Sequence, residues 1–428
     1  MKFLHTADWH LGDTFHGYDR IEEHRHFLKW LEQKIDEEQP DALLVAGDIF
    51  DNANPSAAAE EMLYSFLSDM TRNNEGLQVI LTAGNHDSGR RLEAPASLLK
   101  GMGVVVKGVV EHDDKGLPLM DNLVVPIHSR EDADKEAAVM AVPYLRTGDI
   151  PFHNSRSQSI REFFHDLSKY ARKQMGKNVP LILMAHLYAA GSEVAQDEHS
   201  ERLVIGGEDC IDVGDIYRDA AYVALGHIHK AQRVGANGAA DGSGMSARGG
   251  NVYYSGSALG MSFSERNYHH GINCVVIDDE GYVTMNRIEY KPQRRLLSLP
   301  ETGAAPLPEV LRQIQALPKA DATDCLGWPY IEIRLEEAAP SQTAQNEILR
   351  ALENRAARLC RLVRVVPRGS DDGPRRKMQS LDQLRNISPL DIAMDAYLQA
   401  TGKEMSEDLA ARFQEAANEA GLQADADN

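Results

Sequence analysis

Short apolar runs alternate with longer amphipathic stretches along the first 290 residues of the chain. Five runs rich in Val, Ile and Leu have the length of buried strands: KFLHT (2–6), DALLVAGD (41–48), LQVILTAGN (77–85), VPLILMAH (179–186) and AYVALGH (221–227). Helical patterns separate the first three. Phe27, Leu31 and Ile35 share one face of the first, and Ser56 is the predicted N-cap of the second. This β-α-β-α order predicts a sheet covered by helices.

The pattern changes after residue 230 and predicts a hairpin, a loop, a linker and a second, smaller unit. INCVVIDDEGYVTMNRIEY (272–290) predicts a hairpin that turns at 278–281, and the Gly-rich segment 235–251 predicts a loop. The Pro- and Gly-rich segment 292–308 has the composition of a linker. A small α-β-α-β unit follows, with helices expected in 309–318 and 343–359 and strands in 329–336 and 360–368. We therefore predict three domains: 1–291, 292–370 including the linker, and a tail, 371–428.

The five predicted strands of the first domain all end in side chains that can bind metal. These side chains are Asp8, His10, Asp48, Asn85, His86, His186, His227 and His229. The carboxyl ends of strands in open α/β sheets form the usual ligand crevice, so we expect these residues at one edge of one sheet. Asp8 and His10, like His227 and His229, are two residues apart, which on a strand places both on one face. Gly47, Gly84 and Gly226 precede several of them and permit sharp turns and close backbone approach.

Each of these residues has an ordinary alternative role when it is taken alone. Asp8 could cap a helix, Asp48 could form an Asx-turn, and His186 could be a buried histidine with satisfied hydrogen bonds. As a set they favour a metal site of nitrogen and oxygen ligands without thiolates, suited to Mn, Fe or Zn. Seven ligand residues are too many for one ion, which predicts two ions that share Asp48. His86 directly follows Asn85, and we expect it to assist catalysis rather than bind metal.

Composition and charge limit the partners and the compartment. The formal net charge of −20 argues against broad, charge-driven binding to nucleic acid or to anionic membranes. One basic stretch, 355–377, is an exception, and it either contacts phosphates or simply solvates a helix and a strand edge. Four scattered cysteines and an N-terminus without a signal peptide predict a cytoplasmic protein with reduced thiols. No apolar run approaches the length of a membrane span.

The motifs in these segments resemble those of a known enzyme superfamily. The series DWH, GD, GNHD, H and GHIH resembles the calcineurin-like metallophosphoesterases, whose fold is a four-layer β-sandwich flanked by helices. A closer resemblance is to the SbcD nuclease subunits of bacterial SbcCD complexes. It is carried by HTADWHLG (5–12), LLVAGDIFD (43–51), AGNHDS (83–88), VPYLR (142–146), YVALGHIHKAQ (222–232) and YYSGSALGMSFSE (253–265). WPYIEIRL (328–335) and VRVVPR (363–368) resemble the small α+β capping domain of that group, and SPLDI (388–392) begins a segment like its helical tail.

The resemblance also implies functional assignments for this chain. One ion would be held by Asp8, His10, Asp48 and His229, and a second by Asp48, Asn85, His186 and His227, with His86 catalytic and Mn²⁺ as the usual ion. The family acts on DNA as a 3′→5′ duplex exonuclease and a single-strand endonuclease in repair, recombination and replication. Its partner is SbcC, an ATPase with a long coiled coil, and we expect a homodimer within a heterotetramer that binds SbcC through the tail. The alternatives are a phosphatase or phosphodiesterase with a non-DNA substrate, and a non-catalytic DNA-binding subunit.

Overall fold

The computed structural model describes residues 1–132, 134–193, 211–212, 214, 219–234, 251–320, 326–337 and 341–366, and seven residues of the tail. The chain forms two compact units, Met1–Val366 and Pro367–Asn428. The predicted Gly-rich loop, apart from Asn251, and almost all of the predicted tail helices lie outside the described residues. The division into three domains therefore stays a prediction.

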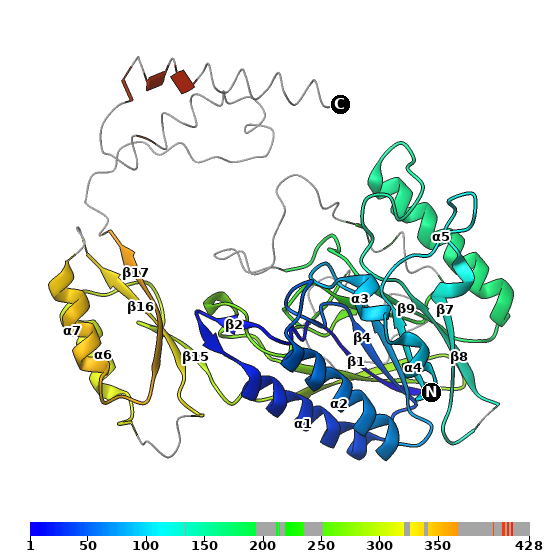
Figure 1. Ribbon diagram of the computed structural model, residues 1–428, viewed down its shortest axis with the longest axis horizontal. Helices are drawn as coiled ribbons and strands as arrows, with labels where there is room; N and C mark the ends of the chain where they lie inside the picture. The colour runs from blue at the N-terminus through cyan, green and yellow to red at the C-terminus, as the bar shows by residue number, and fades with distance from the viewer. Residues whose placement is uncertain are drawn as a thin grey trace. The chain divides into compact units, whose positions relative to one another are not determined.

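Two six-stranded sheets form the larger part of the first unit (Figure 1). The first sheet has the order β14-β13-β1-β4-β5-β6, and the second has the order β11-β12-β10-β9-β8-β7. The strands of the first sheet are β1 (Lys2–Thr6), β4 (Ala42–Ala46), β5 (Gln78–Thr82), β6 (Val104–Lys107), β13 (Gly271–Ile277) and β14 (Val283–Glu289). Those of the second are β7 (Val124–His128), β8 (Glu136–Ala141), β9 (Leu181–His186), β10 (Tyr222–Gly226), β11 (Gln232–Arg233) and β12 (Val252–Tyr254).

The expectation of one sheet was wrong, because the five strands that carry the predicted ligands divide between two sheets. β1, β4 and β5 pair in parallel in the first sheet, whereas β9 and β10 pair in parallel in the second. All five strands are buried on both faces, because each is covered by the other sheet and by helices. A run of this kind gives no sign of which sheet it will join. The predicted hairpin of β13 and β14 is confirmed.

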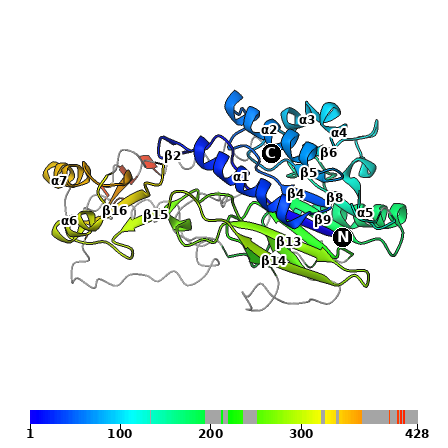
Figure 2. The same cartoon turned by 90° about the horizontal axis from the view of Figure 1, so that it is seen from below.

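Helices cover the outer face of each sheet and complete four layers. They are α1 (Ile21–Glu38), α2 (Ala57–Asn73), α3 (Gly89–Glu93), α4 (Ala96–Lys100) and α5 (Arg156–Met175), and two short 3-10 turns are η1 (Met120–Leu123) and η3 (Phe263–Glu265). α1 and α2 lie side by side (Figures 1 and 2). The predicted face of Phe27, Leu31 and Ile35 is fully buried, and the Ser56 side chain accepts a hydrogen bond from the Ala59 N–H, as an N-cap does.

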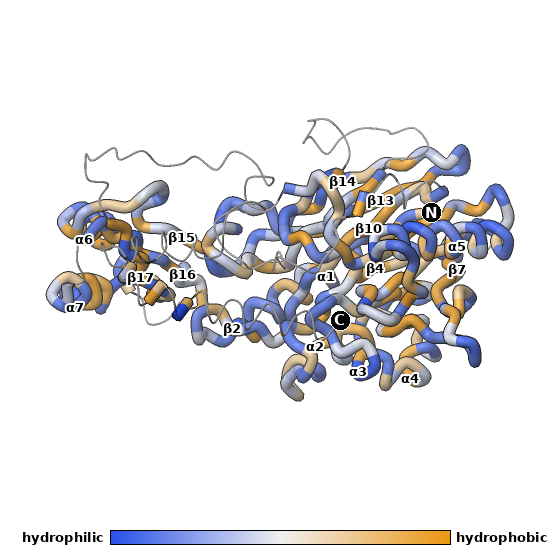
Figure 3. The backbone as a smooth tube through the Cα atoms, turned by 90° about the horizontal axis from the view of Figure 1, so that it is seen from above, coloured by the Kyte–Doolittle hydropathy of each residue, from blue (hydrophilic) through white to orange (hydrophobic). Residues whose placement is uncertain are grey.

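Three apolar layers hold the sandwich together. One lies between the two sheets and includes Phe3, Leu44, Met184 and Tyr222, and the other two lie beneath the helices on either side. Figure 3 shows hydrophobic residues along β4 and β10, the central strands of this interior. This arrangement confirms the predicted four-layer sandwich. Within the described residues, no helix has the length and apolar run that a membrane span requires.

A third, smaller sheet with two helices forms the predicted capping unit. Its parallel strands are β15 (Leu296–Leu299), β16 (Tyr330–Glu336) and β17 (Arg358–Val365). Its helices are α6 (Leu307–Ala316) and α7 (Gln342–Leu352). Near the N-terminus, β2 (Thr14–Phe15) and β3 (Tyr18–Asp19) form a separate hairpin. The interpretation of 292–308 as a linker was wrong for β15, whose Leu297 and Leu299 pack on the core of this unit. The predicted helix over 343–359 ends at Leu352, because the chain beyond Arg358 pairs with β16.

Buried contacts join the capping unit to the sandwich. The Tyr330 hydroxyl donates to Glu23 Oε2 at 2.7 Å, and Arg294 Nη1 donates to the same oxygen at 3.1 Å. Tyr330 also packs on Phe15, with ring centroids 5.1 Å apart. Glu23 and Tyr330 are almost fully buried, and Arg20 also donates to Glu23 Oε1 at 3.3 Å, so this buried carboxylate is paired at both of its oxygens.

Candidate metal centre

The loops after β1 and β4 present the first donors of the site. The backbone N–H of Asp8 donates to Gly47 O at 3.1 Å and that of His10 donates to Asp48 O at 3.0 Å, so the two loops run as a pair. Asp8, His10 and Asp48 have φ values of 52°, 48° and 47°. Residues other than glycine rarely adopt this left-handed conformation, and such strained positions concentrate at functional sites.

The two-residue spacing does not act through strand geometry, contrary to expectation. Asp8 and His10 lie beyond β1 in left-handed backbone, and His227 lies beyond β10 with a φ of 101°. Alternation along an extended strand therefore cannot explain why both members of each pair turn toward the site. The turns themselves produce the convergence.

Three glycines allow the loops of the site to approach one another: Gly47 and Gly226 between the two sheets, and Gly84 between the loops after β5 and β4. A Cβ on Gly47 would lie 2.2 Å from His186 Nδ1, and one on Gly84 would lie 2.1 Å from Asp48 Oδ1. A Cβ on Gly226 would lie 1.8 Å from Ala46 O. The prediction that these glycines permit close approach is confirmed, because any side chain at these positions would collide with a ligand or its backbone.

The predicted donors come together in overlapping groups, although they come from five loops. Three sets have one donor atom per residue within 4.8 Å of one another: Asp8, His10 and His229; His10, Asp48 and His86; and Asp8, Asp48 and His186. Asp48 Oδ2 lies 3.3 Å from His186 Nε2 and 3.8 Å from His10 Nε2, so this carboxylate lies between two histidines. This position suits the expectation that Asp48 is shared by two ions.

Asn85 joins two of the three site histidines that come from the second sheet. Its Oδ1 lies 3.0 Å from His186 Nε2 and 3.2 Å from His227 Nδ1. The His227 backbone N–H donates to Asp8 Oδ1 at 2.9 Å, which ties the end of β10 to the loop after β1. All eight predicted site residues therefore lie in one region where the two sheets meet.

Hydrogen bonds behind the donors fix the orientation of three imidazole rings. His186 Nδ1 lies 2.9 Å from Ala46 O, His229 Nδ1 lies 3.2 Å from Glu265 Oε1, and His86 Nδ1 lies 2.7 Å from Asp51 O. A histidine whose Nδ1 bonds an oxygen in this way presents its Nε2 as the nitrogen that can bind a cation.

The residues fit divalent cations, and His10 provides the clearest test. It is buried, and its ring nitrogens lie near carboxylate oxygens but beyond hydrogen-bond distance within the described chain, with Nδ1 3.6 Å from Asp51 Oδ1 and Nε2 3.8 Å from Asp48 Oδ2. A cation bound among these groups would give the imidazole and the carboxylates a shared partner at shorter distance. The nitrogen and oxygen donors match the ions expected from the sequence.

Charge in the site favours the same conclusion. Burial alone would lower the pKa of His186, but the nearby Asp48 carboxylate raises that pKa to about 9. Burial would likewise raise the pKa of Asp48, and His186, His10 and His86 instead hold it below its ordinary value. Asp48 is thus kept as a carboxylate, the form that binds cations.

His86 has a position open to two roles. Its backbone N–H donates to Asp48 Oδ1 at 2.9 Å, and its ring lies edge-on to His10 with centroids 4.8 Å apart. It is half-buried, unlike Asp8, His10 and Asp48. The geometry groups it with His10 and Asp48, so the assignment of His86 as a residue that does not bind metal stays a prediction.

Sequence reasoning missed two carboxylates that support the site. Asp87 accepts hydrogen bonds from the backbone N–H groups of Ile49, Phe50 and Gly84, and so holds the loops after β4 and β5 together. Glu265 lies behind His229. Asp87 stands beside His86 in the GNHD motif, which was the available signal for it. Glu265 follows no strand end, and nothing in the spacing pointed to it.

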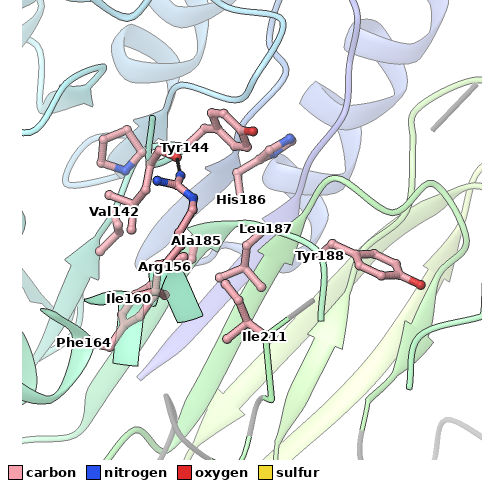
Figure 4. Close-up of a pocket in the computed structure, with 12 residues that line it drawn as sticks. Val142, Tyr144, Arg156, Ile160, Phe164, Ala185, His186, Leu187, Tyr188 and Ile211 are labelled. Atoms are coloured by element: carbon pink, nitrogen blue, oxygen red, sulfur yellow. Dashed lines mark hydrogen bonds between the residues drawn. The ribbon is translucent and has the colours of Figure 1, made fainter. Parts of the chain in front are cut away.

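A small pocket adjoins His186 but does not suit a substrate. Figure 4 shows Tyr144 and His186 next to each other, and their ring centroids are 6.2 Å apart. Leu187, Ile211 and Phe164 line the apolar part. The volume is about 40 Å³. This is room for about three water molecules, so the pocket is too small for a nucleotide base.

A helix-flanked double sheet with nitrogen and oxygen donors at its strand ends defines a metal-dependent phosphoesterase. Residues 1–231 match the family model described as calcineurin-like phosphoesterase, and residues 292–401 match the one described as type 5 capsule protein repressor C-terminal domain. The chain is 36% identical over 378 residues to the SbcD subunit of the SbcCD nuclease of Rhodobacter capsulatus. The aligned region covers 86% of this chain and 88% of that protein.

Two further relatives carry the same name. Identity is 31% to the Bacillus subtilis protein, over 64% of this chain and 66% of that one, and 30% to the Escherichia coli K12 protein, over 62% of each. The chain therefore belongs to the SbcD family of calcineurin-like phosphoesterases, which confirms the resemblance in its motifs. It is a metal-dependent phosphodiesterase.

Proposed function

We propose that this chain is the nuclease subunit of an SbcCD-type complex, which cuts DNA as a 3′→5′ exonuclease on duplex ends and as an endonuclease on single strands. Such cutting would serve DNA repair, recombination and replication in the cytoplasm, where bacterial DNA lies. The observation that carries the proposal is the convergence of eight donor and acid–base side chains from two sheets, in a chain whose relatives are named as nuclease subunits.

The proposed ligands divide into two sets around Asp48. Asp8, His10, Asp48 and His229 would hold one ion, and Asp48, Asn85, His186 and His227 would hold the other, most simply Mn²⁺. The 3.3 Å and 3.8 Å separations of Asp48 Oδ2 from His186 and His10 support the shared place of this carboxylate. Two bound cations would stabilise the charge of a phosphoryl transfer and lower the pKa of the attacking water.

His86 would serve the reaction through its Nε2. The hydrogen bond from Nδ1 to Asp51 O leaves Nε2 as the nitrogen that faces a substrate. From there a protonated imidazole can stabilise the charged phosphate or protonate the leaving oxygen.

The arginines of the capping unit are less free than the sequence suggested. Arg361 donates from two nitrogens to Glu332, Arg355 donates to Leu317 O, and Arg364 Nε lies 3.4 Å from Glu337. Arg358 lies over the ring of Tyr18. These contacts favour a structural role for part of the basic stretch, and any phosphate contact would use the donors that remain.

The partner would be SbcC, as the names of the relatives imply, and the family resemblance adds that SbcC is an ATPase with a long coiled coil. We propose that two copies of this chain join two copies of that ATPase, and that the tail beyond residue 380 makes the contact in a helix-in-groove manner.

The experiment that tests the function measures Mn²⁺-dependent release of nucleotides from end-labelled duplex DNA, with and without the ATPase. His86→Gln should keep its metal content but lose about 10²–10⁴-fold in cutting rate, the range for a positioned acid–base group. His128→Gln, an exposed histidine on β7, is the matched control and should cut normally. Wild-type protein that binds Mn²⁺ but hydrolyses only small phosphate esters would overturn the DNA nuclease proposal.

A further inference from the structure

The segment between β12 and β13 wraps around the group formed by Asp8, His10 and His229. The Ser257 N–H donates to His229 O at 3.1 Å and the Ala258 N–H donates to Asp8 O at 3.2 Å. The segment then turns through η3, which ends in Glu265. The turn is therefore attached by its backbone to two of the three members of that group.

Glu265 is a buried carboxylate directed at an imidazole. It is 1% exposed, its Oε1 lies 3.2 Å from His229 Nδ1, and its Oε2 accepts a hydrogen bond from the Met261 N–H at 2.9 Å. We propose that Glu265 is the positioning residue for His229: it keeps the proton on Nδ1, fixes the ring, and so presents Nε2 to the cation shared with Asp8 and His10. A carboxylate partner also makes the imidazole a stronger donor.

The same turn is held from its other side by the capping unit. Phe263, two residues before Glu265, lies beneath the guanidinium of Arg361 on β17 at 5.3 Å from the ring centroid. Its ring is also 5.4 Å from that of Phe15, which packs on Tyr330 of β16. Short, buried contacts thus run from the capping sheet through η3 to His229. A shift of the capping unit would move the carboxylate that orients this ligand.

A purely structural role for Glu265 is the competing explanation. Its acceptance of the Met261 N–H closes the turn, and loss of that bond alone would destabilise the protein without a specific effect on metal. The two explanations differ in what they predict for metal binding. A positioning residue affects one of two ions, whereas a turn-closing residue affects the melting temperature and leaves both affinities unchanged.

The experiment titrates metal-free full-length protein with Mn²⁺ by calorimetry and records the melting temperature of each variant. Glu265→Ala should weaken Mn²⁺ binding at the group of Asp8, His10 and His229 by about 10–100-fold, which is the range for residues that hold a metal ligand in place. The affinity for the other ion should stay unchanged. Glu265→Gln keeps one oxygen that can accept from Nδ1, and should recover part of that affinity.

Glu289→Gln is the matched control, since Glu289 also has a carboxylate oxygen 3.2 Å from a histidine Nδ1, that of His269, but both side chains are exposed. It should bind both ions as the wild type does. Phe263→Leu tests the link to the capping unit. It should lower the affinity for the same ion as Glu265→Ala does, by a smaller factor.

This inference rests on the proposed two-ion centre, and the results separate the two. Wild-type protein that binds fewer than two Mn²⁺ ions would overturn the centre itself. Wild-type protein that binds two, with both affinities unchanged in Glu265→Ala and Glu265→Gln, would overturn only the role of Glu265, whatever their melting temperatures.

Discussion

His5 makes the stability of the sandwich depend on pH. It lies on β1 of the first sheet and is fully buried. Two of its contacts reach β10 of the second sheet, since Nδ1 lies 3.0 Å from the Tyr222 hydroxyl and Nε2 lies 3.2 Å from Leu225 O, and Asn273 Nδ2 on β13 lies 3.5 Å from Nδ1. Burial lowers the pKa of His5 to about 3, which the bond to Leu225 O opposes and the charge of Arg287 assists. The folded protein therefore keeps this ring neutral.

The sign and size of the effect follow from proton linkage. An unfolded histidine has its ordinary pKa of about 6.5, so between that value and about 3 the unfolded chain binds a proton that the folded chain does not. The contribution of the neutral His5 to the free energy of unfolding is fully present above pH 6.5 and is lost as the pH falls below that value. At pH 5 the loss is about 2 kcal/mol, since each pH unit in this window is worth about 1.4 kcal/mol.

The assay is urea unfolding of the metal-free protein at pH 8 and pH 5, followed by the fluorescence of Trp9, which is buried, and of Trp30, which is partly buried against the same core. His5→Gln cannot take up the proton, so its stability difference between the two pH values should be smaller than that of the wild type by about 2 kcal/mol. His128→Gln, an exposed histidine, should retain the wild-type difference. If His5→Gln also retains it, burial does not keep His5 neutral and the reasoning is refuted.

Three further predictions concern the site, the capping unit and the tail. Gly84→Ala should abolish metal binding and cutting, because its Cβ would lie 2.1 Å from Asp48 Oδ1, and calorimetry with Mn²⁺ checks this. Replacing Arg355 and Arg358 by Gln should flatten the salt dependence of DNA binding if their remaining donors contact phosphates, and an unchanged slope would favour a purely structural role. Deleting the chain from Ser380 should abolish co-purification with the ATPase but leave Mn²⁺-dependent cutting of single-stranded DNA, and full retention of the ATPase would contradict the assigned role of the tail.

Residue types and their order along the chain were sufficient to predict that the eight site residues lie together and to predict the strands that carry them, but not α3, α4, β6, β7, β8 and α5. Strand ends are visible in a sequence because an apolar run stops abruptly, as it does at Asp48 and His186. The division of five strands between two sheets was not visible, because strands buried on both faces look alike. β15 was missed because a four-residue strand flanked by Pro and Gly has the composition of a linker.

The geometry of the donors could not be predicted either, because it depends on backbone conformations that side-chain patterns do not encode. The left-handed φ values of Asp8, His10 and His227 arise where loops of the two sheets meet. Glu265 was invisible for a related reason, since it reaches His229 only after the chain has folded around the second sheet.

The centre is assembled by the packing of the two sheets, because contacts between the sheets hold its donors together. Asp8 accepts a hydrogen bond from the His227 N–H across the sheets, and His186 from the second sheet bonds Ala46 O of the first. Gly226 permits this approach, because a Cβ there would lie 1.8 Å from Ala46 O. This explains why glycines and strained residues, each unfavourable alone, occur together at the ends of these strands.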